Sequence, residues 1–191
     1  MDDKTLLENI NNGELSAVRL LVEENKNLVW HIIIAMTGRN SDCEDLFQEV
    51  FLRVFKGIKH FRADARLSTW IGSVTHHVCV DYLRKKKREM SFQHDAPDQS
   101  TVFKSASDRS WQKTENEDLN KVVLAAIAGL PADFRTVISL YHLDERSYRE
   151  ISEITGMPEG TVKSYISRGR NLLREMLIAQ VPDLTEILDD F

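Results

Sequence analysis

The sequence contains few of the residues that interrupt regular structure. Its 191 residues include only 8 glycines and 4 prolines, the two residue types that most strongly mark turns and breaks. No alternation of polar and apolar residues extends far enough to predict a sheet. Apolar residues instead recur at helical spacing along almost the whole chain. The sequence therefore predicts an all-α protein.

Long apolar runs and cysteine pairs are also scarce. The apolar runs are far shorter than the roughly 20 residues that a membrane-spanning helix needs, and no basic start followed by an apolar core predicts a secretory signal. The two cysteines, Cys43 and Cys79, are too few for a disulfide framework. We expect them to be free thiols in a reducing compartment, and the protein to be cytoplasmic.

The net charge of −5 at first argues against a nucleic-acid-binding protein. The basic residues are nevertheless clustered, at 84–88 and between 163 and 174. Salt screens charges that lie more than about 10 Å apart, so a local basic surface can bind phosphate on an acidic molecule. The charge distribution therefore leaves nucleic-acid binding open.

A polar segment divides the sequence in two. Residues 91–116 are rich in Ser, Asp and Gln without a sustained apolar period, which predicts a flexible linker. We expect small helical domains at 1–90 and 117–178, and an acidic tail at 179–191. The linker contains four apolar residues that have two equally good interpretations. They dock on a partner or on one of the domains, or they are incidental residues of an ordinary linker: Phe92, Val102, Phe103 and Trp111.

Residues 147–177 predict a helix-turn-helix. Ser147 and Glu150 have the spacing of a capping box, which marks a helix start. Gly156 suits the left-handed position that ends a helix, and Pro158 is favourable in the first turn of the next one because it has no N–H to lose there. A short helix, a glycine-containing turn and a longer helix together form this motif.

The second helix of this motif has an apolar face and a polar face. At about 100° per residue, Val162, Ile166, Gly169 and Leu173 fall in one sector and should be buried. The other face suits a helix in the DNA major groove. A charged face alone would favour a solvated structural helix, but the turn, the caps and the small serines favour DNA binding. The polar face consists of Lys163, Ser164, Ser167, Arg168, Arg170, Asn171 and Arg174.

The segment that begins at Ser41 predicts an amphipathic helix. Ser41 and Glu44 have the spacing of a second capping box. Leu52 lies in the middle of the polar face, which is typical of a protein-binding patch, although isolated exposed leucines are common. The expected core residues are Leu46, Phe47, Val50, Phe51, Val54 and Ile58.

A third helix, at about 69–88, carries two histidines, a cysteine and a basic run. His77 and Cys79 point about 160° apart on a helix, so they cannot chelate one ion together. His76 and Cys79 supply two ligands at most, whereas a stable zinc site takes at least three from the protein. We therefore expect no metal site, and place both histidines on the same face as Arg84.

These segments together resemble a bacterial sigma factor of the extracytoplasmic-function (ECF) class. The resemblance covers nearly the whole chain in three ordered blocks. They are EDLFQEVFLRVF at 44–55, FRADARLSTWIGSV with VDYLRKKKR between 61 and 88, and the helix-turn-helix block from LPADFR to NLLR at 130–174.

The resemblance implies two surfaces in the N-terminal domain. The helix at 44–55 matches the one that docks on the clamp helices of the polymerase β′ subunit, through Asp45, Gln48, Glu49 and Leu52. The loop at 61–69 matches the one that captures a flipped base of the minus-ten element, where an unstacked base exposes its edges, and the next helix matches the reader of that element. The implied minus-ten residues are Phe61, Arg62, Asp64, Ser68, Ser73, His76, His77, Arg84, Lys85 and Lys87.

The resemblance implies a third surface and a set of partners. The last helix matches the reader of the minus-thirty-five element. The implied partners are core RNA polymerase through its β′ and β subunits, promoter DNA, and an anti-sigma factor that is membrane-tethered. No cofactor, small-molecule substrate or enzymatic activity is expected. The implied minus-thirty-five residues are Thr161, Lys163, Ser164, Ser167, Arg168 and Arg170.

The sequence departs from the family pattern at three positions. His76 and His77 stand where the family commonly has Arg-Asn, and Tyr165 replaces the usual arginine after the GTVKS motif. A histidine offers a hydrogen-bonding polarity that depends on its tautomer, unlike the asparagine amide. These changes bear on the promoter sequence rather than on the activity.

Two other function classes make different demands on the sequence. A stand-alone metal-responsive regulator would use the His/Cys cluster and would bind zinc or nickel with an effect on operator affinity that needs no polymerase. An enzyme with a helical nucleic-acid domain would need a phosphate-binding glycine loop, paired catalytic carboxylates or an activated nucleophile, and the sequence shows none of them.

Overall fold

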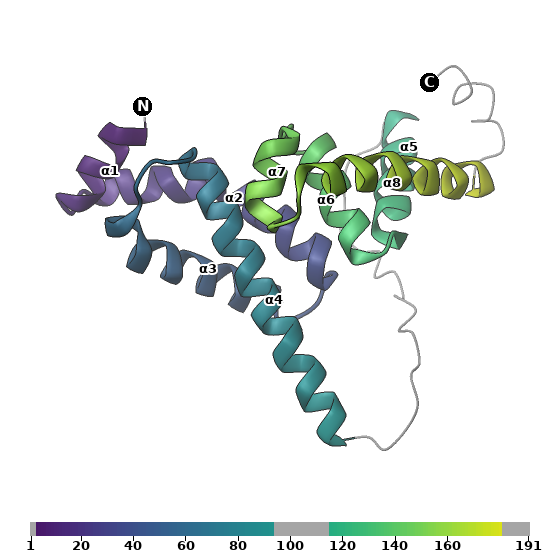
Figure 1. The fold of residues 1–191 in the computed structure, drawn as a ribbon, viewed down its shortest axis with the longest axis horizontal. Helices are drawn as coiled ribbons and strands as arrows, with labels where there is room; N and C mark the ends of the chain where they lie inside the picture. Colours follow the sequence, from purple (N-terminus) through teal and green to yellow (C-terminus); the bar gives the residue numbers. More distant parts are fainter. Residues whose placement is uncertain (1–2, 94–114, 181–191) are drawn as a thin grey trace.

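The computed structural model describes residues 3–93 and 115–180, and all regular structure in these residues is helical. The N-terminal part contains α1 (Asp3–Asn11), α2 (Leu15–Thr37), α3 (Cys43–Gly57), a 3-10 turn η1 (Ile58–His60) and α4 (Leu67–Gln93). The C-terminal part contains α5 (Glu115–Gly129), α6 (Ala132–His142), α7 (Tyr148–Thr155) and α8 (Glu159–Gln180) (Figure 1). The all-α prediction is confirmed.

Parts of the predicted linker and tail lie outside the described residues. The described N-terminal helices run to Gln93 and the C-terminal ones begin at Glu115. The predicted docking of Phe92, Val102, Phe103 and Trp111 therefore falls outside the described side chains, and so does most of the acidic tail after Gln180.

The N-terminal core lies between α2, α3 and α4. Val29 and Ile33 of α2 pack with Val50 of α3 and with Ile71 and Val78 of α4, and none of these side chains is more than 2% exposed. Burial of such side chains contributes about 1.5–3 kcal/mol each before entropic costs. The apolar periodicity of the three helices thus leads directly to one packed layer.

Helix α2 is buried on a second side as well. Leu28 and Ile32 face away from the N-terminal core and pack with Leu140 of α6 and with Ile151 and Ile154 of α7. The helix-turn-helix therefore completes its own core with two residues of the N-terminal domain. The two helical domains pack directly on each other, with α6 against α2 and α7 against α4.

The close approach of α7 to α4 depends on a glycine. A Cβ atom at Gly72 would lie 2.9 Å from side-chain atoms of Ile154, which is closer than real Cβ contacts come. Figure 1 shows α7 against the N-terminal half of α4, whereas the C-terminal half of α4 extends beyond the rest of the helices. The basic run at 84–88 lies in this extended half.

Local signals in the helix-turn-helix form as the sequence predicts. The Ser147 hydroxyl accepts from the backbone N–H of Glu150, and the Glu150 carboxylate accepts from the backbone N–H of Ser147, so the capping box is complete. Gly156 ends α7 with φ of 73°, in the left-handed region. Pro158 lies immediately before α8 rather than in its first turn, and its carbonyl accepts from the N–H of Val162.

The capping box predicted at Ser41 is wrong. Helix α3 begins at Cys43 after Asp42, and no side chain caps its first turn. The Ser41 hydroxyl instead donates to the Asp42 carboxylate, while the Asn40 side chain accepts from the backbone N–H of Asp42. Asn40 thus organises the turn by an Asx-type bond, which competes with the serine cap.

Candidate functional site

The outer face of α3 carries an exposed leucine among polar side chains. The Leu52 side chain is 54% exposed, and Asp45 and Gln48 next to it are exposed as well. Glu49 is half-buried and accepts from Arg53 Nε at 2.7 Å, and Arg53 Nη1 donates to an α4 carboxylate at 2.9 Å. The structure therefore brings the four predicted polymerase-binding residues onto one surface, with Glu49 already held by Arg53.

A cavity of about 410 Å³ opens beside the loop between η1 and α4. The rings of Phe61 and Trp70 form part of its wall, with centroids 5.3 Å apart. Ala63 turns the loop with φ of 56°, and the Asp3 carboxylate of α1 accepts from the backbone N–H of Leu67 at the start of α4. The loop is thus held at its Leu67 end. The cavity is lined by His60, Phe61, Arg62, Asp64, Ala65, Thr69, Trp70, Ser73 and Glu153.

Side chains of the C-terminal domain reach this cavity. Glu153 of α7 forms part of its wall. Arg146 Nη1 donates to the Ser68 hydroxyl at 2.9 Å, and the Glu150 carboxylate lies 3.7 Å from the Arg66 guanidinium. A predicted base-capture residue, Ser68, is therefore bonded to the other domain.

A histidine–aspartate pair also joins the two domains. His31 Nδ1 of α2 lies 2.9 Å from Asp144 Oδ1, and the Asp144 side chain is 8% exposed. The hydrogen bond to Asp144 raises the pKa of His31 above its usual value near 6.5, against the opposing effect of burial. The charge on His31 strengthens this pair, so its electrostatic contribution is full below pH 6.5 and lost as pH rises through the raised pKa.

We therefore expect the thermal unfolding midpoint of the protein to fall between pH 6 and pH 9. The fall should be larger than that of an Asp144→Asn variant over the same range. The variant keeps an oxygen acceptor but has no charge to hold the His31 proton, so its pH profile is flatter. Thermal unfolding midpoints of both proteins at several pH values measure the difference. Parallel profiles would contradict a charged pair at this position.

The two adjacent histidines of α4 have different surroundings. His76 is half-buried, and burial lowers its pKa, with the nearby Asp133 of α6 acting in the opposite direction. His77 is exposed, and its Nδ1 lies 2.7 Å from the carbonyl oxygen of Ser73. Because a carbonyl only accepts, His77 donates from Nδ1. A neutral His77 therefore presents Nε2 to solvent as an acceptor.

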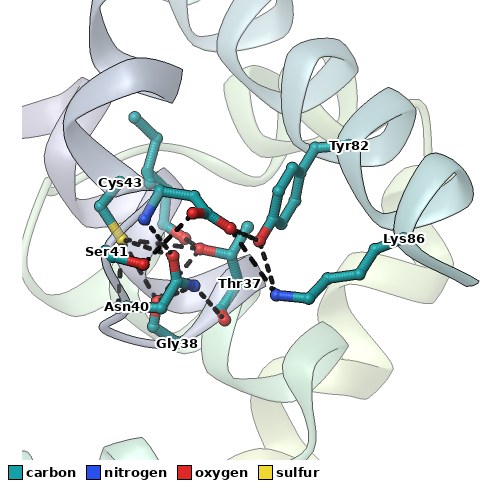
Figure 2. A network of polar contacts seen from close by, with 9 residues as sticks. Thr37, Gly38, Asn40, Ser41, Cys43, Tyr82 and Lys86 are labelled. Carbon is teal, nitrogen blue, oxygen red and sulfur yellow. Dashed lines mark hydrogen bonds and ion pairs between the residues drawn. The ribbon is translucent and has the colours of Figure 1, made fainter. Parts of the chain in front are cut away.

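The basic run of α4 divides between two roles. Figure 2 shows Tyr82 and Lys86 directed toward the loop before α3. The Tyr82 hydroxyl donates to Asp42 Oδ2 at 2.6 Å and accepts from Lys86 Nζ at 2.8 Å, and the bond from Tyr82 lowers the pKa of Asp42. Lys86 thus fixes α4 to the α3 side of the domain. The other cations of the run are exposed and line a shared hollow, with Lys85 3.8 Å from Glu89: Arg84, Lys85, Lys87 and Arg88.

The predicted buried stripe of α8 is confirmed at three of its four residues, whereas Leu173 is half-buried. Val162 and Ile166 are at most 2% exposed, and Gly169 is buried. Tyr165, which replaces the usual arginine, stacks on Phe134 of α6 with ring centroids 4.7 Å apart. Thr161 is half-buried, and the other predicted DNA-facing residues of α8 are exposed: Lys163, Ser164, Ser167, Arg168 and Arg170.

Comparisons with known proteins identify two regions of the chain. The family model for Sigma-70 region 2 matches residues 21–89, and the model for Sigma-70 region 4 matches residues 121–173. The chain is 30% identical to the ECF RNA polymerase sigma factor SigW of Bacillus subtilis, over 91% of this chain and 96% of that protein. It is 29% identical to the ECF RNA polymerase sigma-E factor of Haemophilus influenzae, over 93% and 96%. The chain belongs to the ECF family of RNA polymerase sigma factors.

Solved structures show the same fold. The sigma factor RpoE from Bartonella quintana, in complex with the anti-sigma factor NepR, matches with a TM-score of 0.66 and 24% identity, over 83% of this chain and 95% of that one. CnrH, in complex with the cytosolic domain of CnrY, matches with a TM-score of 0.64 and 18% identity, over 93% and 97%. The sigma factor is therefore built from region 2, which includes α2 to α4, and a region 4 helix-turn-helix.

No finding supports the metal-responsive alternative for this sigma factor. Among the described residues, no three His, Cys, Asp or Glu side chains are placed to hold a metal ion together. Cys43 and Cys79 are both buried free thiols, and burial raises the pKa of Cys79 to about 12. Within residues 3–93 and 115–180, no helix combines the length and apolar character that crossing a bilayer requires.

Some contacts of the sigma factor had no signal in the sequence. Arg146, Glu150 and Glu153 approach the region 2 cavity from the other domain. Their spacing is that of an ordinary exposed helix start, and only the tertiary packing of α7 on α4 shows what they face. His142 and Tyr141 contact Arg170, and Phe134 contacts Arg168. These contacts likewise depend on how α6 packs on α8.

Proposed function

We propose that three surfaces of this ECF sigma factor carry out its function. The outer face of α3 binds core RNA polymerase, through the β′ clamp helices. The cavity beside the loop between η1 and α4, which is shorter than the predicted 61–69 loop because α4 begins at Leu67, and the outer face of α4 bind and melt the minus-ten element. Helix α8 reads the minus-thirty-five element. The protein works in the cytoplasm without catalysing a reaction or holding a cofactor.

The observation that carries this proposal is the exposed Leu52 on α3. An apolar side chain that is 54% exposed within a polar face suits the centre of a protein interface, where apolar anchors are surrounded by polar residues. Arg53 on this face of α3 also bonds to Asp81 of α4, about one turn before the basic run of that helix. A polymerase bound to α3 would therefore hold DNA against α4.

The packed arrangement of the two domains has to open for this function. The names minus-ten and minus-thirty-five place the two promoter elements about 25 base pairs apart. This separation is roughly 85 Å at about 3.4 Å per base pair. Region 4 packs directly on α2 and α4 and lines the minus-ten cavity with Glu153. The closed form therefore cannot present both reading surfaces to one promoter.

We propose an anti-sigma factor as the partner that restrains the protein. The structurally similar RpoE and CnrH were solved in complex with an anti-sigma factor and with the cytosolic domain of CnrY, respectively. A partner that stabilises the packed domains would keep the minus-ten cavity covered. We expect this partner to be membrane-tethered, as the family pattern implies.

Titration of core polymerase with the fluorescently labelled protein tests the proposal. We expect saturable binding of one molecule per core enzyme, with a gain in affinity for promoter DNA when both are present. No binding to core at micromolar concentration would overturn the assignment of α3.

His77 should determine part of the minus-ten preference. Neutral His77 presents one acceptor, whereas an asparagine amide offers both donors and an acceptor, so His77→Asn should shift the preferred base at one or two positions. A loss of roughly 1–3 kcal/mol per wrong base contact corresponds to about 5- to 150-fold discrimination. Transcription from a library of randomised minus-ten elements measures the preference. An unchanged preference would make the histidine an incidental surface residue.

A further inference from the structure

The recognition helix α8 packs closely on α6 at Gly169. A Cβ atom at Gly169 would lie 2.9 Å from the Ile138 side chain and 3.4 Å from the Phe134 ring. Helix α6 therefore covers the side of α8 on which Gly169 lies. At about 100° per residue, Arg168 and Arg170 point to the two opposite flanks of α8, about 100° to either side of Gly169.

Aromatic rings of α6 hold both arginines. The Arg168 guanidinium lies 5.5 Å from the centroid of Phe134, and the Arg170 guanidinium lies 5.3 Å from the centroid of Tyr141. Both distances are within the range of cation–π attraction. Phe134 is itself fixed by its stack on Tyr165, which explains structurally why an aromatic residue replaces the family's arginine at this position.

A hydrogen bond adds to the hold on Arg170. Arg170 Nε donates to His142 Nε2 at 3.2 Å. Arginine has no acceptor, so His142 must be neutral and carry its proton on Nδ1. Burial and the charge of Arg170 both lower the pKa of His142, which agrees with a neutral ring.

Two serines lie on the side of α8 away from Gly169, together with the exposed Lys163, Asn171 and Arg174. Ser167 lies about 160° and Ser164 about 140° from Gly169 around the helix, and both are exposed. A major groove is about 12 Å wide and a helix with its side chains about 10–12 Å across. The outermost side chains therefore meet base edges, while those on the flanks meet the phosphates of the two strands.

We infer that Arg168 and Arg170 clamp the phosphates on the two sides of the groove, while Ser164 and Ser167 read the bases. Phe134 and Tyr141 are the positioning residues that keep the two guanidinium groups on opposite flanks of α8. This inference rests on the proposed binding of α8 to the minus-thirty-five element. Within that surface it assigns two residues to affinity and two others to specificity.

Salt dependence separates the two roles. The full-length protein is titrated with a duplex selected from a random-sequence pool and with a scrambled duplex, between 50 and about 200 mM salt, a range that resolves counterion release. Arg168→Gln and Arg170→Gln should weaken both duplexes equally and lower the slope of log Kd against log salt by about 0.9 each. Ser164→Ala or Ser167→Ala should lower only the ratio between the two duplexes. Arginine variants that lower this ratio at an unchanged slope would overturn the inference.

Conservative variants test the positioning role. Phe134→Leu should lower the salt slope although every charge is retained, and Phe134→Tyr, which keeps a ring, should restore it. The double variant Phe134→Leu/Arg168→Gln should show no further loss of slope, because Phe134 acts through Arg168. Additive losses would show that Phe134 acts on the fold instead. If the protein binds no selected duplex more tightly than its scrambled form, α8 does not read DNA and the proposed function fails too. If only the roles of the arginines are wrong, the preference for the selected duplex remains.

Discussion

The Leu52→Asp variant is expected to bind core RNA polymerase at least 30-fold more weakly than the unchanged protein. Anchoring residues at the centre of an interface cost about 2 kcal/mol or more when removed, which is about 30-fold in affinity. Aspartate also places a charge where the partner surface has to lose its water. Competition for core polymerase against the labelled protein gives the ratio of affinities.

A second leucine provides the matched control for this measurement. Leu15 is 72% exposed at the start of α2, before the region 2 match begins at residue 21. Leu15→Asp makes the same chemical change outside the proposed interface, and it should leave core affinity unchanged. Equal affinities of the two variants would mean that α3 is not the docking face.

Replacement of Arg135 by methionine is expected to lower the free energy of unfolding by about 3 kcal/mol. Arg135 is 5% exposed and lies where the carbonyl ends of two helices meet. Its Nε donates to the carbonyl of Ala35 near the end of α2, and its Nη1 donates to the carbonyls of Ala128 and Leu130 at the end of α5. Final carbonyls of a helix have no partner within it, so methionine removes the donor from the carbonyls of Ala35 and Ala128 and from that of Leu130 just after α5.

Urea unfolding followed by circular dichroism measures this loss. Arg149→Met is the control, because Arg149 is exposed and pairs only with Glu153 on its own helix among the contacts described. Surface pairs of this kind contribute little, so the control should unfold at the same urea concentration as the unchanged protein. A midpoint for Arg135→Met equal to that of the control would show that its buried bonds are dispensable.

Local features of the fold could be predicted because they depend on neighbours in the sequence. The capping box at Ser147 and the left-handed Gly156 involve residues within one turn of each other. The failure at Ser41 also has a local cause, since Asn40 offers a competing bond to the same turn. Spacing alone does not decide between two such residues.

The packing of the two domains could not be predicted from periodicity. Leu28 and Ile32 lie in a helix that is apolar on more than one side. Nothing in their spacing shows that they complete the core of the other domain. The same limit applies to the site. The faces of α3 and α8 follow from angular projection, whereas the contact of Arg146 with Ser68 joins residues 78 positions apart.

Run-off transcription with purified core polymerase is the most direct test of the central claim, that this protein gives the polymerase its promoter specificity. Fragmented genomic DNA serves as template, with and without the protein. The account predicts discrete transcripts that appear only when the protein is added and that disappear with Leu52→Asp. The same transcripts from core polymerase alone would contradict it.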